Sequence, residues 1–372
     1  MIIGIDASRY SHNEATGVEW YSWHIINQLI KEIEKKEYFE GILYSRYPLT
    51  LPSHGPKIKS RVICGRKFWT LLHLSREMMR KKKPDALFVP SHVLPLRLPN
   101  KSIITIHDVA FKYLKSSYSY FQYKYLNWST KFAVKNADKI IVPSEATKRD
   151  LISFFKCPEE KIRVVYHGFD APKIDKKSID KVFETSDAFK HFGINKGMDY
   201  LLFVGRLESK KNLSRTVEAF KDFSRMHPNY KLILAGKRGV GFDQILKVVE
   251  KNKLNGKVIM PGYITEEEKA ALYKYTKAFI FPSLYEGFGL PILEAFHYGK
   301  PVITSHVSCL PEVAGDAAHF VDPYDVQIIA AGLEKVINDT DYSQELISKG
   351  KERLKDFTWE KAARETFEVI ID

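Results

Sequence analysis

Two glutamates, Glu286 and Glu294, stand eight residues apart on either side of the stretch Gly-Phe-Gly-Leu-Pro-Ile-Leu. Pro291 suits the first turn of a helix, so we expect Glu286 in a loop and Glu294 about one turn inside that helix. Carboxylates accept strong charge-assisted hydrogen bonds from hydroxyl groups. The stretch therefore favours a site for the hydroxyl groups of one extended ligand; the alternative is a loop and an amphipathic helix with solvated acids. No His, Asp or Cys stands nearby at ligand spacing, so no metal is expected.

A second group of residues follows the predicted strand Tyr200–Val204 and contains Gly205, Arg206 and Lys211. The glycine allows close approach of the backbone, and Lys211 stands at the start of the next predicted helix, whose N-terminus adds partial positive charge. Arginine binds a diphosphate bidentately, and lysine supplies a mobile point charge. The group predicts a diphosphate site, with a solvated basic loop as the alternative.

Two positions in the first half of the chain are further candidates. His107 follows the predicted strand Ser102–Ile106, where it could hydrogen-bond a sugar hydroxyl or a phosphate, although an isolated histidine is more often structural. Gly17 directly precedes a predicted helix, so backbone amides there could approach an anion. The surrounding sequence is neither a GxGxxG nor a Walker loop, so neither NAD nor P-loop ATP chemistry is indicated.

Short runs of consecutive apolar residues alternate with helical patterns along the whole chain, which is typical of strands covered on both faces. This alternation predicts an α/β fold made of two doubly wound parallel sheets with a cleft between them. The predicted strands are Ile2–Ile5, Gly41–Tyr44, Arg61–Cys64, Ala86–Val89, Ser102–Ile106, Lys139–Val142, Ile162–Tyr166, Tyr200–Val204, Lys231–Ala235, Lys257–Met260, Ala278–Phe281, Pro301–Thr304 and His319–Val321. Ligands of such sheets bind beyond the carboxyl ends of the strands, where the candidates above are located.

With 372 residues, the chain is long enough for two domains. We expect an N-terminal domain over 1–170, a linker over 171–197 and a C-terminal domain over 198–358, with a last helix within 359–372 that could pack on either half. The N-terminus indicates a first strand and no signal peptide, and no stretch has the apolar length of a membrane-spanning helix. The three cysteines lack CxxC spacing and favour reduced thiols in a cytoplasmic protein.

The stretches "SLYEGFGLPILEA" and "VGRLESKKNL" closely resemble glycosyltransferase family 4, the retaining sugar-nucleotide enzymes of the GT-B fold. The resemblance extends over most of the chain and includes "GIDASR", "TIHD", "PSEATKRDL", "LPEVAGDAA" and "FTWEKAA". It implies two facing Rossmann-like domains, an acceptor-binding N-terminal one and a donor-binding C-terminal one. It also implies a hexosyltransferase that needs no cofactor and no metal, because cationic side chains bind the diphosphate.

The resemblance also implies roles for the candidate residues. Glu294 would bind the ribose of the donor nucleotide and Glu286 would face the donor sugar, while Arg206 and Lys211 would stabilise the diphosphate leaving group. The backbone N–H groups of Phe288, Gly289 and Leu290 would contact the sugar hydroxyls. His107 would lie near the transferred sugar, and Gly17 near the phosphates or the acceptor. Gly205 would lie at the phosphates, and Tyr263 would cover the nucleobase. His167 stands where many relatives have asparagine, and we interpret it as a hinge residue.

The net charge of +13 is concentrated in one half of the chain. Residues 1–170 contain 28 Lys/Arg and 16 Asp/Glu, whereas residues 171–372 contain 30 and 29. Within the basic half, Phe68–Lys83 and Phe111–Lys135 combine lysines or arginines with aromatic residues, which is typical of membrane-surface binders. We therefore expect peripheral attachment to an anionic membrane, which suits a lipid-linked saccharide acceptor. The alternative is that the aromatics form core and the lysines a solvated face.

Two functions other than a transferase are alternatives. A basic nucleic-acid-binding protein is disfavoured because the chain has no RRM, KH, helix-turn-helix or zinc-finger signature. Another GT-B sugar-nucleotide enzyme, such as a hydrolase, an epimerase or a sugar-phosphate transferase, fits the same motifs. Among donors, the "IDASR" and "TIHD" stretches resemble mannosyltransferases that elongate bacterial surface polysaccharides and favour GDP-mannose over UDP-sugars.

Overall fold

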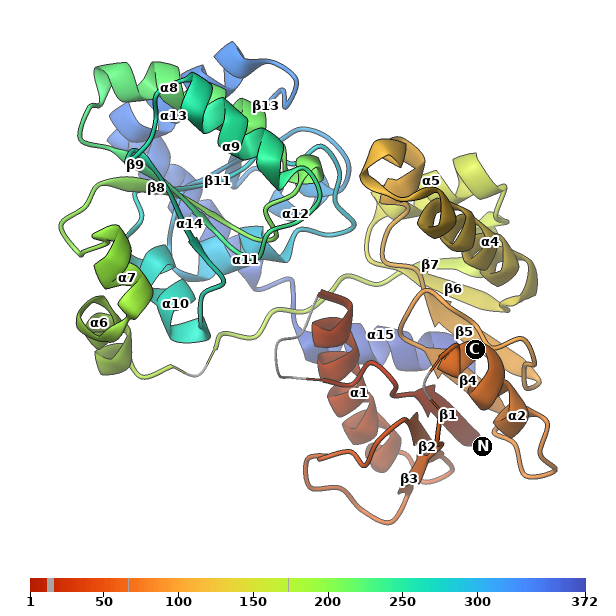
Figure 1. The fold of residues 1–372 in the computed structure, drawn as a ribbon. Coiled ribbons are helices and arrows are strands. Elements are labelled where there is room, and N and C mark those ends of the chain that lie inside the picture. Colours follow the sequence, from red (N-terminus) through yellow and green to blue (C-terminus); the bar gives the residue numbers. More distant parts are fainter. Residues whose placement is uncertain (12–16, 66, 173) are drawn as a thin grey trace. The chain divides into compact units, whose positions relative to one another are not determined.

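The chain forms two compact units (Figure 1). The computed structural model describes residues 1–372 apart from 12–16, 66 and 173. Unit 1 comprises Met1–Gly168 and Phe357–Asp372, and unit 2 comprises Phe169–Asp356. Each unit has its own parallel sheet with helices on its faces, so the predicted α/β class with two doubly wound sheets is confirmed.

The sheet of unit 1 has seven strands in the order β3-β2-β1-β4-β5-β6-β7, and every neighbouring pair is parallel. The order reverses between β1 and β4, which makes this pair the switch point of the sheet. The strands are β1 (Ile2–Asp6), β2 (Glu40–Ser45), β3 (Ile58–Val62), β4 (Ala86–Val89), β5 (Lys101–Thr105), β6 (Lys139–Val142) and β7 (Ile162–Val164). The helical elements are α1 (Gly17–Lys35), η1 (Trp69–Leu74), α2 (Ser75–Met78), α3 (Ala110–Tyr113), η2 (Lys115–Ser117), α4 (Tyr120–Asn136), α5 (Glu145–Phe155), η3 (Glu159–Lys161) and α15 (Trp359–Ile371).

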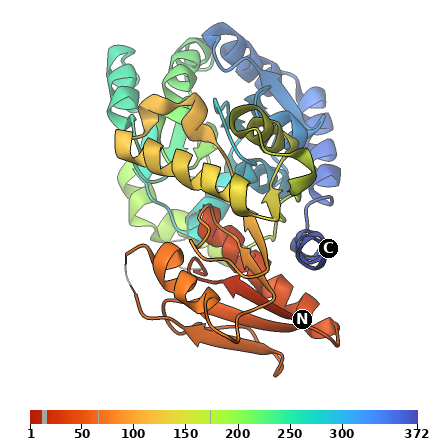
Figure 2. The same ribbon diagram turned by 90° about the vertical axis from the view of Figure 1, so that its right-hand side faces the viewer.

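The last helix completes the core of unit 1. Its apolar positions recur at helical spacing, and they pack with the buried face of α1 and with the central strands in one cluster. Figure 1 and Figure 2 show this dark blue helix on the unit that carries the red N-terminus. The question of which half α15 joins, which the sequence left open, is therefore answered in favour of unit 1.

The sheet of unit 2 has six parallel strands in the order β10-β9-β8-β11-β12-β13, so its switch point lies between β8 and β11. The strands are β8 (Tyr200–Val204), β9 (Lys231–Ala235), β10 (Val258–Gly262), β11 (Ala278–Phe281), β12 (Val302–Ser305) and β13 (Ala318–Val321). The helical elements are α6 (Lys176–Thr185), α7 (Asp187–Phe192), η4 (Ser209–Lys211), α8 (Leu213–Met226), α9 (Phe242–Lys251), α10 (Glu266–Tyr275), α11 (Leu290–His297), α12 (Leu310–Ala314), α13 (Val326–Asn338) and α14 (Thr340–Leu354).

Two segments differ from the expectations. The strand expected at Arg61–Cys64 runs over Ile58–Val62, because the edge strand pairs residue by residue with β2 and buries only Ile58 fully. The segment expected as a linker, 171–197, contains α6 and α7 and belongs to unit 2. Its buried apolar residues are Ile179, Val182, Phe189 and Ile194, and four such residues among many lysines are too few to stand out in the sequence.

Gly168 lies where the chain leaves unit 1 and packs directly against the start of α15. A Cβ atom at this position would lie 2.2 Å from the Trp359 nitrogen and 2.5 Å from its Cα, and both are backbone atoms. We therefore expect Gly168→Ala to lower the stability of unit 1 by about 1–3 kcal/mol, because backbone must move to make room. Differential scanning calorimetry measures the change. Gly197→Ala, whose Cβ would meet only the Asn195 amide oxygen at 3.4 Å, is the control, and equal melting curves for the two variants would refute the close packing.

Candidate functional site

The candidate residues of unit 2 lie beyond the carboxyl ends of β8 and β11, at the switch point of the sheet. Gly205 directly follows β8 with φ +151, and Gly236 directly follows β9 with φ +145. A Cβ atom on Gly236 would lie 1.9 Å from the carbonyl oxygen of Gly205. Both positions therefore require glycine. Other residues adopt these φ angles only with strain, and a side chain on Gly236 would clash with the backbone of Gly205.

A buried ion pair joins the segment after β8 to the loop after β11. The Nζ of Lys211, the last residue of η4, lies 2.5 Å from Oε1 of Glu286, and the two side chains are 11% and 9% exposed. The ammonium also lies 4.9 Å from the centre of the Phe281 ring, at the end of β11. The sequence-predicted residues Lys211 and Glu286 are thus brought together, although 75 positions separate them.

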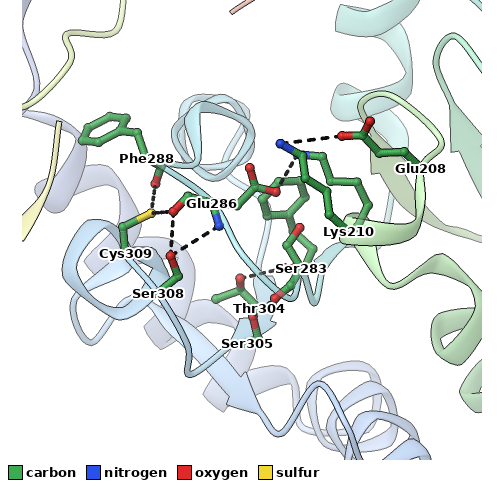
Figure 3. A network of polar contacts seen from close by, with 11 residues as sticks. Glu208, Lys210, Ser283, Glu286, Phe288, Thr304, Ser305, Ser308 and Cys309 are labelled. Atoms are coloured by element: carbon green, nitrogen blue, oxygen red, sulfur yellow. Dashed lines mark hydrogen bonds and ion pairs between the residues drawn. The ribbon is translucent and has the colours of Figure 1, made fainter. Parts of the chain in front are cut away.

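The cationic loop before α8 is fastened to the same strand end. The N–H of Leu284 donates to the carbonyl of Lys210 at 2.8 Å, and Nζ of Lys210 lies 3.6 Å from the Glu208 carboxylate (Figure 3). Arg206 is exposed, and its side-chain stem passes close to Gly239. Arg206 is therefore accessible to solvent, in contrast to the buried Lys211.

The loop that carries Glu286 is held from behind by two neighbouring side chains. Ser308 Oγ donates to the Glu286 carbonyl at 2.6 Å and accepts from the Glu286 N–H at 3.3 Å, and Cys309 Sγ lies 3.2 Å and 3.1 Å from the carbonyls of Glu286 and Phe288 (Figure 3). Burial and the Glu286 charge raise the pKa of the Cys309 thiol well above its usual value, so it stays a neutral donor. Ser308 holds φ +59, a strained value for a residue other than glycine.

A helix N-terminus follows this loop directly. Gly289 has φ +103 and caps α11, which begins at Leu290 with Pro291 in its first turn, as expected. Phe288 is buried, so the loop is packed on its inner side. A helix N-terminus presents N–H groups and partial positive charge, which suits oxygen-rich ligands.

Glu294 lies inside α11, where two side chains of α10 hold its carboxylate. Lys269 Nζ donates to Oε1 at 2.8 Å, and the Tyr273 hydroxyl donates to Oε2 at 2.9 Å. Burial alone would lower the pKa of Lys269, but the carboxylates of Glu294 and Glu266 outweigh it and raise that pKa. Burial and the charge of Glu294 raise the pKa of Tyr273 well above its usual value. The lysine is therefore charged and the tyrosine protonated, and both orient the carboxylate.

Tyr263 follows β10 and is 55% exposed. Lys237, which follows the neighbouring strand β9, places its Nζ 4.5 Å from the centre of the Tyr263 ring. The two side chains offer an aromatic face and a cation at the same edge of the sheet, a combination that suits a planar ring system.

The histidine candidates lie in unit 1, in a buried aromatic cluster. The ring of Tyr21 contacts those of His107 and His167 at 4.7 Å and 4.6 Å, and His167 also lies parallel to Trp359. His167, predicted to be a hinge, is 6% exposed within the core of unit 1. That interpretation has no support in the packing: the ring fills space between α1 and α15.

His107 is 7% exposed, and its Nε2 lies 2.9 Å from the carbonyl oxygen of Pro90. Burial, with a smaller contribution from His92, lowers the pKa of His107 to about 3. The imidazole is therefore neutral at physiological pH. Because a carbonyl only accepts, Nε2 carries the proton and Nδ1 is the acceptor. Gly17 is the first residue of α1 and is exposed, and the segment 12–16 before it lies outside the described residues.

Sequence reasoning missed the residues that hold the two glutamates in place. Lys269 and Tyr273 are four residues apart on α10 and so share one face of it, a pattern that the sequence displays but does not connect to Glu294. Ser308 and Cys309 carry no signal at all, since a left-handed serine cannot be recognised without its φ angle.

Two family models match the chain in succession. The model described as "Glycosyltransferase Family 4" matches residues 17–172, and the model "Glycosyl transferases group 1" matches residues 184–353. The chain is 28% identical over 368 residues to O-antigen chain mannosyltransferase B of Escherichia coli, with 94% of both chains covered.

Solved structures share the fold. Sucrose-phosphate synthase from Thermosynechococcus elongatus has a TM-score of 0.73 at 18% identity, with 99% of this chain and 98% of that chain covered. HepE of Anabaena, solved in complex with UDP and glucose, has a TM-score of 0.71 at 17% identity, with 100% and 99% covered. From the two consecutive family matches, the mannosyltransferase relative and these structures, we conclude that the chain is a family 4 glycosyltransferase of the GT-B fold.

Proposed function

We propose that this enzyme is a retaining glycosyltransferase that moves a hexose, with mannose from GDP-mannose favoured, to a saccharide or lipid-linked saccharide. The product would be a surface polysaccharide or glycolipid. The observation that carries the proposal is the buried pair of Lys211 and Glu286 beside the N-terminus of α11, at the switch point of unit 2. Retention of configuration rests on the family resemblance alone.

The cations would act on the leaving group. Breaking the anomeric bond builds negative charge on the nucleoside diphosphate, and fixed positive groups bind this developing charge more strongly in the transition state than in the ground state. Lys211 is held in place by Glu286, whereas Arg206 is exposed and can fold onto the diphosphate as it binds. With these two cations and the partial charge of the α11 N-terminus, the role usually given to a divalent metal would be filled by the chain itself.

The acidic side chains would recognise the hydroxyl groups of the donor. Glu286 and the N–H groups of Phe288, Gly289 and Leu290 are assigned to the sugar, and Glu294 to the ribose. The carboxylate of Glu294 already accepts from Lys269 and Tyr273, and each carboxylate oxygen has a second lone pair for a ribose hydroxyl. The aromatic face of Tyr263 beside Lys237 is assigned to the nucleobase.

His107 would serve as an acceptor of hydrogen bonds near the transferred sugar. With Nε2 donating to the Pro90 carbonyl, Nδ1 can accept a hydrogen bond from a sugar hydroxyl but has no proton to donate. The low pKa of about 3 keeps this arrangement unchanged over the pH range in which a transferase works.

The donor is the open choice within the proposal. The relative named a mannosyltransferase supports mannose, and the neighbour solved with UDP and glucose supports a uridine nucleotide. A thermal-shift screen with GDP- and UDP-sugars distinguishes them, because a ligand that binds only the native state raises the melting temperature. Release of nucleotide from the preferred donor without an acceptor would favour a hydrolase, whereas a transferase releases it only with an acceptor.

We expect Glu294→Ala to lower kcat/KM for the donor about 10- to 150-fold, because one charge-assisted hydrogen bond of about 1.5–3 kcal/mol is lost. Steady-state kinetics with varied donor measures the effect. Tyr273→Phe removes the hydrogen bonds of this hydroxyl to Oε2 and to the Pro291 carbonyl but keeps Glu294, and it serves as the control, with a smaller expected effect. An unchanged kcat/KM in Glu294→Ala would remove this residue from the donor site.

Ser308 gives a test that separates positioning of the loop from stability. Ser308→Ala and Ser308→Gly both lose the two hydrogen bonds to Glu286, so we expect both to lower kcat/KM about tenfold. Only the glycine variant relieves the strain at φ +59, so it should unfold at a higher temperature than the alanine variant. A glycine variant with full activity would show that the hydroxyl positions nothing.

Attachment to a membrane surface is the second part of the proposal. Phe111 and the residues Trp69, Leu71 and Leu74 are core, which agrees with the alternative for those positions. In contrast, α4 and the residues before it expose large aromatic side chains beside exposed lysines, namely Tyr113, Tyr120, Phe121, Trp128, Lys115, Lys124, Lys131 and Lys135. These exposed aromatic rings and lysines support the proposed binding to anionic lipids. In the described part of the chain, no helix combines the length and apolarity that crossing a bilayer requires.

We expect the enzyme to float with vesicles that contain anionic phosphatidylglycerol at low salt, and not with neutral vesicles. Replacing Lys124 and Lys131 by glutamine should weaken vesicle binding about thirtyfold, at about 1 kcal/mol for each lysine. Phe121→Ser, which removes the most exposed aromatic ring of α4, should weaken it further. Tyr324→Ser, at an exposed aromatic residue of unit 2, is the control. Equal flotation of all variants would contradict the role of α4.

A further inference from the structure

Unit 1 contains a cavity of about 380 Å³ that the roles assigned above leave unused. Among its lining residues, Arg9, Arg46 and His92 follow the carboxyl ends of β1, β2 and β4, and Tyr125 belongs to α4. Since β1 and β4 form the switch point of this sheet, the cavity occupies the place where parallel sheets bind ligands.

The cavity carries positive charge without matching negative charge. Among the described residues that line it, two are arginines and none is a carboxylate. The Nε of Arg46 is buried and makes no hydrogen bond within the described part of the chain. A buried N–H without an acceptor costs free energy, so this group is suited to an acceptor that arrives with a ligand.

Two acidic side chains, Asp6 and Glu19, interact with these arginines. Asp6 accepts from the N–H of Ser8 at 2.9 Å and from the hydroxyl of Thr70 at 3.0 Å, and burial raises the pKa of its carboxyl although the charge of Arg46 opposes that shift. Arg9 forms a long ion pair with Glu19, at 3.4 Å between Nη1 and Oε1, and its side chain is 54% exposed. Exposed ion pairs of this kind contribute little to stability, so Arg9 can leave Glu19 for a ligand at a small cost in free energy.

Aromatic side chains form the walls. Arg46 lies 5.9 Å from the centre of the buried Trp69 ring, which fixes the guanidinium. Phe68 is 60% exposed although its backbone holds φ +52, a conformation that a bulky residue rarely adopts. Strain of this kind marks functional segments. Together with Tyr125, these rings offer flat apolar faces of the type on which sugar rings stack.

We propose that this cavity binds the acceptor saccharide through an anionic group, a phosphate or a carboxylate, held by Arg9 and Arg46. The inference rests on the proposed function, because it names the chemical class of that enzyme's acceptor. Arginine recognises both groups through paired hydrogen bonds, and the aromatic walls add contact with the sugar ring. A neutral saccharide would leave the buried Nε of Arg46 without an acceptor.

Isothermal titration of the full chain tests the proposal with three probes: mannose 6-phosphate, glucuronate and mannose. We expect one or both anionic sugars to bind and mannose to bind at least tenfold more weakly. Preference between phosphate and carboxylate identifies the group. Equal affinity for the neutral sugar overturns the proposal, and so does displacement of the anionic sugar by GDP or UDP, since it would assign the cavity to the donor.

Variants place the binding in the cavity. Arg46→Gln and Arg9→Gln should each lower the affinity for the anionic sugar about 10- to 150-fold, which corresponds to the loss of one charge-assisted hydrogen bond. The affinity for the nucleotide sugar should stay unchanged. Arg46→Lys should restore part of the loss. Arg163→Gln removes the same charge from the exposed edge strand β7 and is the control. Arg9 is exposed, so we expect Arg9→Gln to fold even if the Arg46 variants do not. Normal binding of the anionic sugar by Arg9→Gln overturns the proposal.

The two proposals fail in different ways. If anionic sugars bind in an Arg9-dependent manner but no nucleotide sugar binds, the proposed function is wrong and the cavity remains an anion site. If the enzyme transfers the sugar from a nucleotide sugar but anionic sugars do not bind, the proposed function stands and the inference about its acceptor is wrong.

Discussion

The proposed donor site depends on one buried ion pair, between Lys211 after β8 and Glu286 after β11. Removing either partner would leave a buried charge uncompensated, which is strongly unfavourable. The pair therefore fixes two loops that come from strands far apart in the sequence. The backbone of the Glu286 loop is held separately, at its carbonyl groups. Ser308 and Cys309 provide the second restraint.

The same sheet geometry organises both units. In each, the strand order reverses at one pair of parallel strands, and charged side chains gather past their carboxyl ends. Unit 2 balances its cation with an acid, as Lys211 and Glu286 show, whereas the cavity of unit 1 has two arginines among its described lining residues and no carboxylate. The concentration of positive charge in the first half of the chain thus has a local counterpart inside the fold as well as on the exposed face of α4.

The strands were predictable because consecutive apolar residues such as those of β4 and β8 must be covered on both faces, and the positions of Lys211 and Glu286 followed from the rule for parallel sheets. The edge strand β3 was misplaced because only one of its residues is fully buried, so its neighbours carry no pattern. The partners of Glu294 come from another helix, and contacts between helices are not encoded in local periodicity. The aromatic partners of His167, Tyr21 and Trp359, could not be foreseen, since they lie far from it in the sequence.

Helix α15 fills the core of unit 1, yet it follows the whole of unit 2 along the chain. On a ribosome the residues of unit 2 emerge before this helix, so unit 2 can acquire its complete core first. The N-terminal sheet must wait with the apolar face of α1 uncovered until α15 has been synthesised. The order of synthesis and the order of completion are therefore reversed for the two halves of this protein.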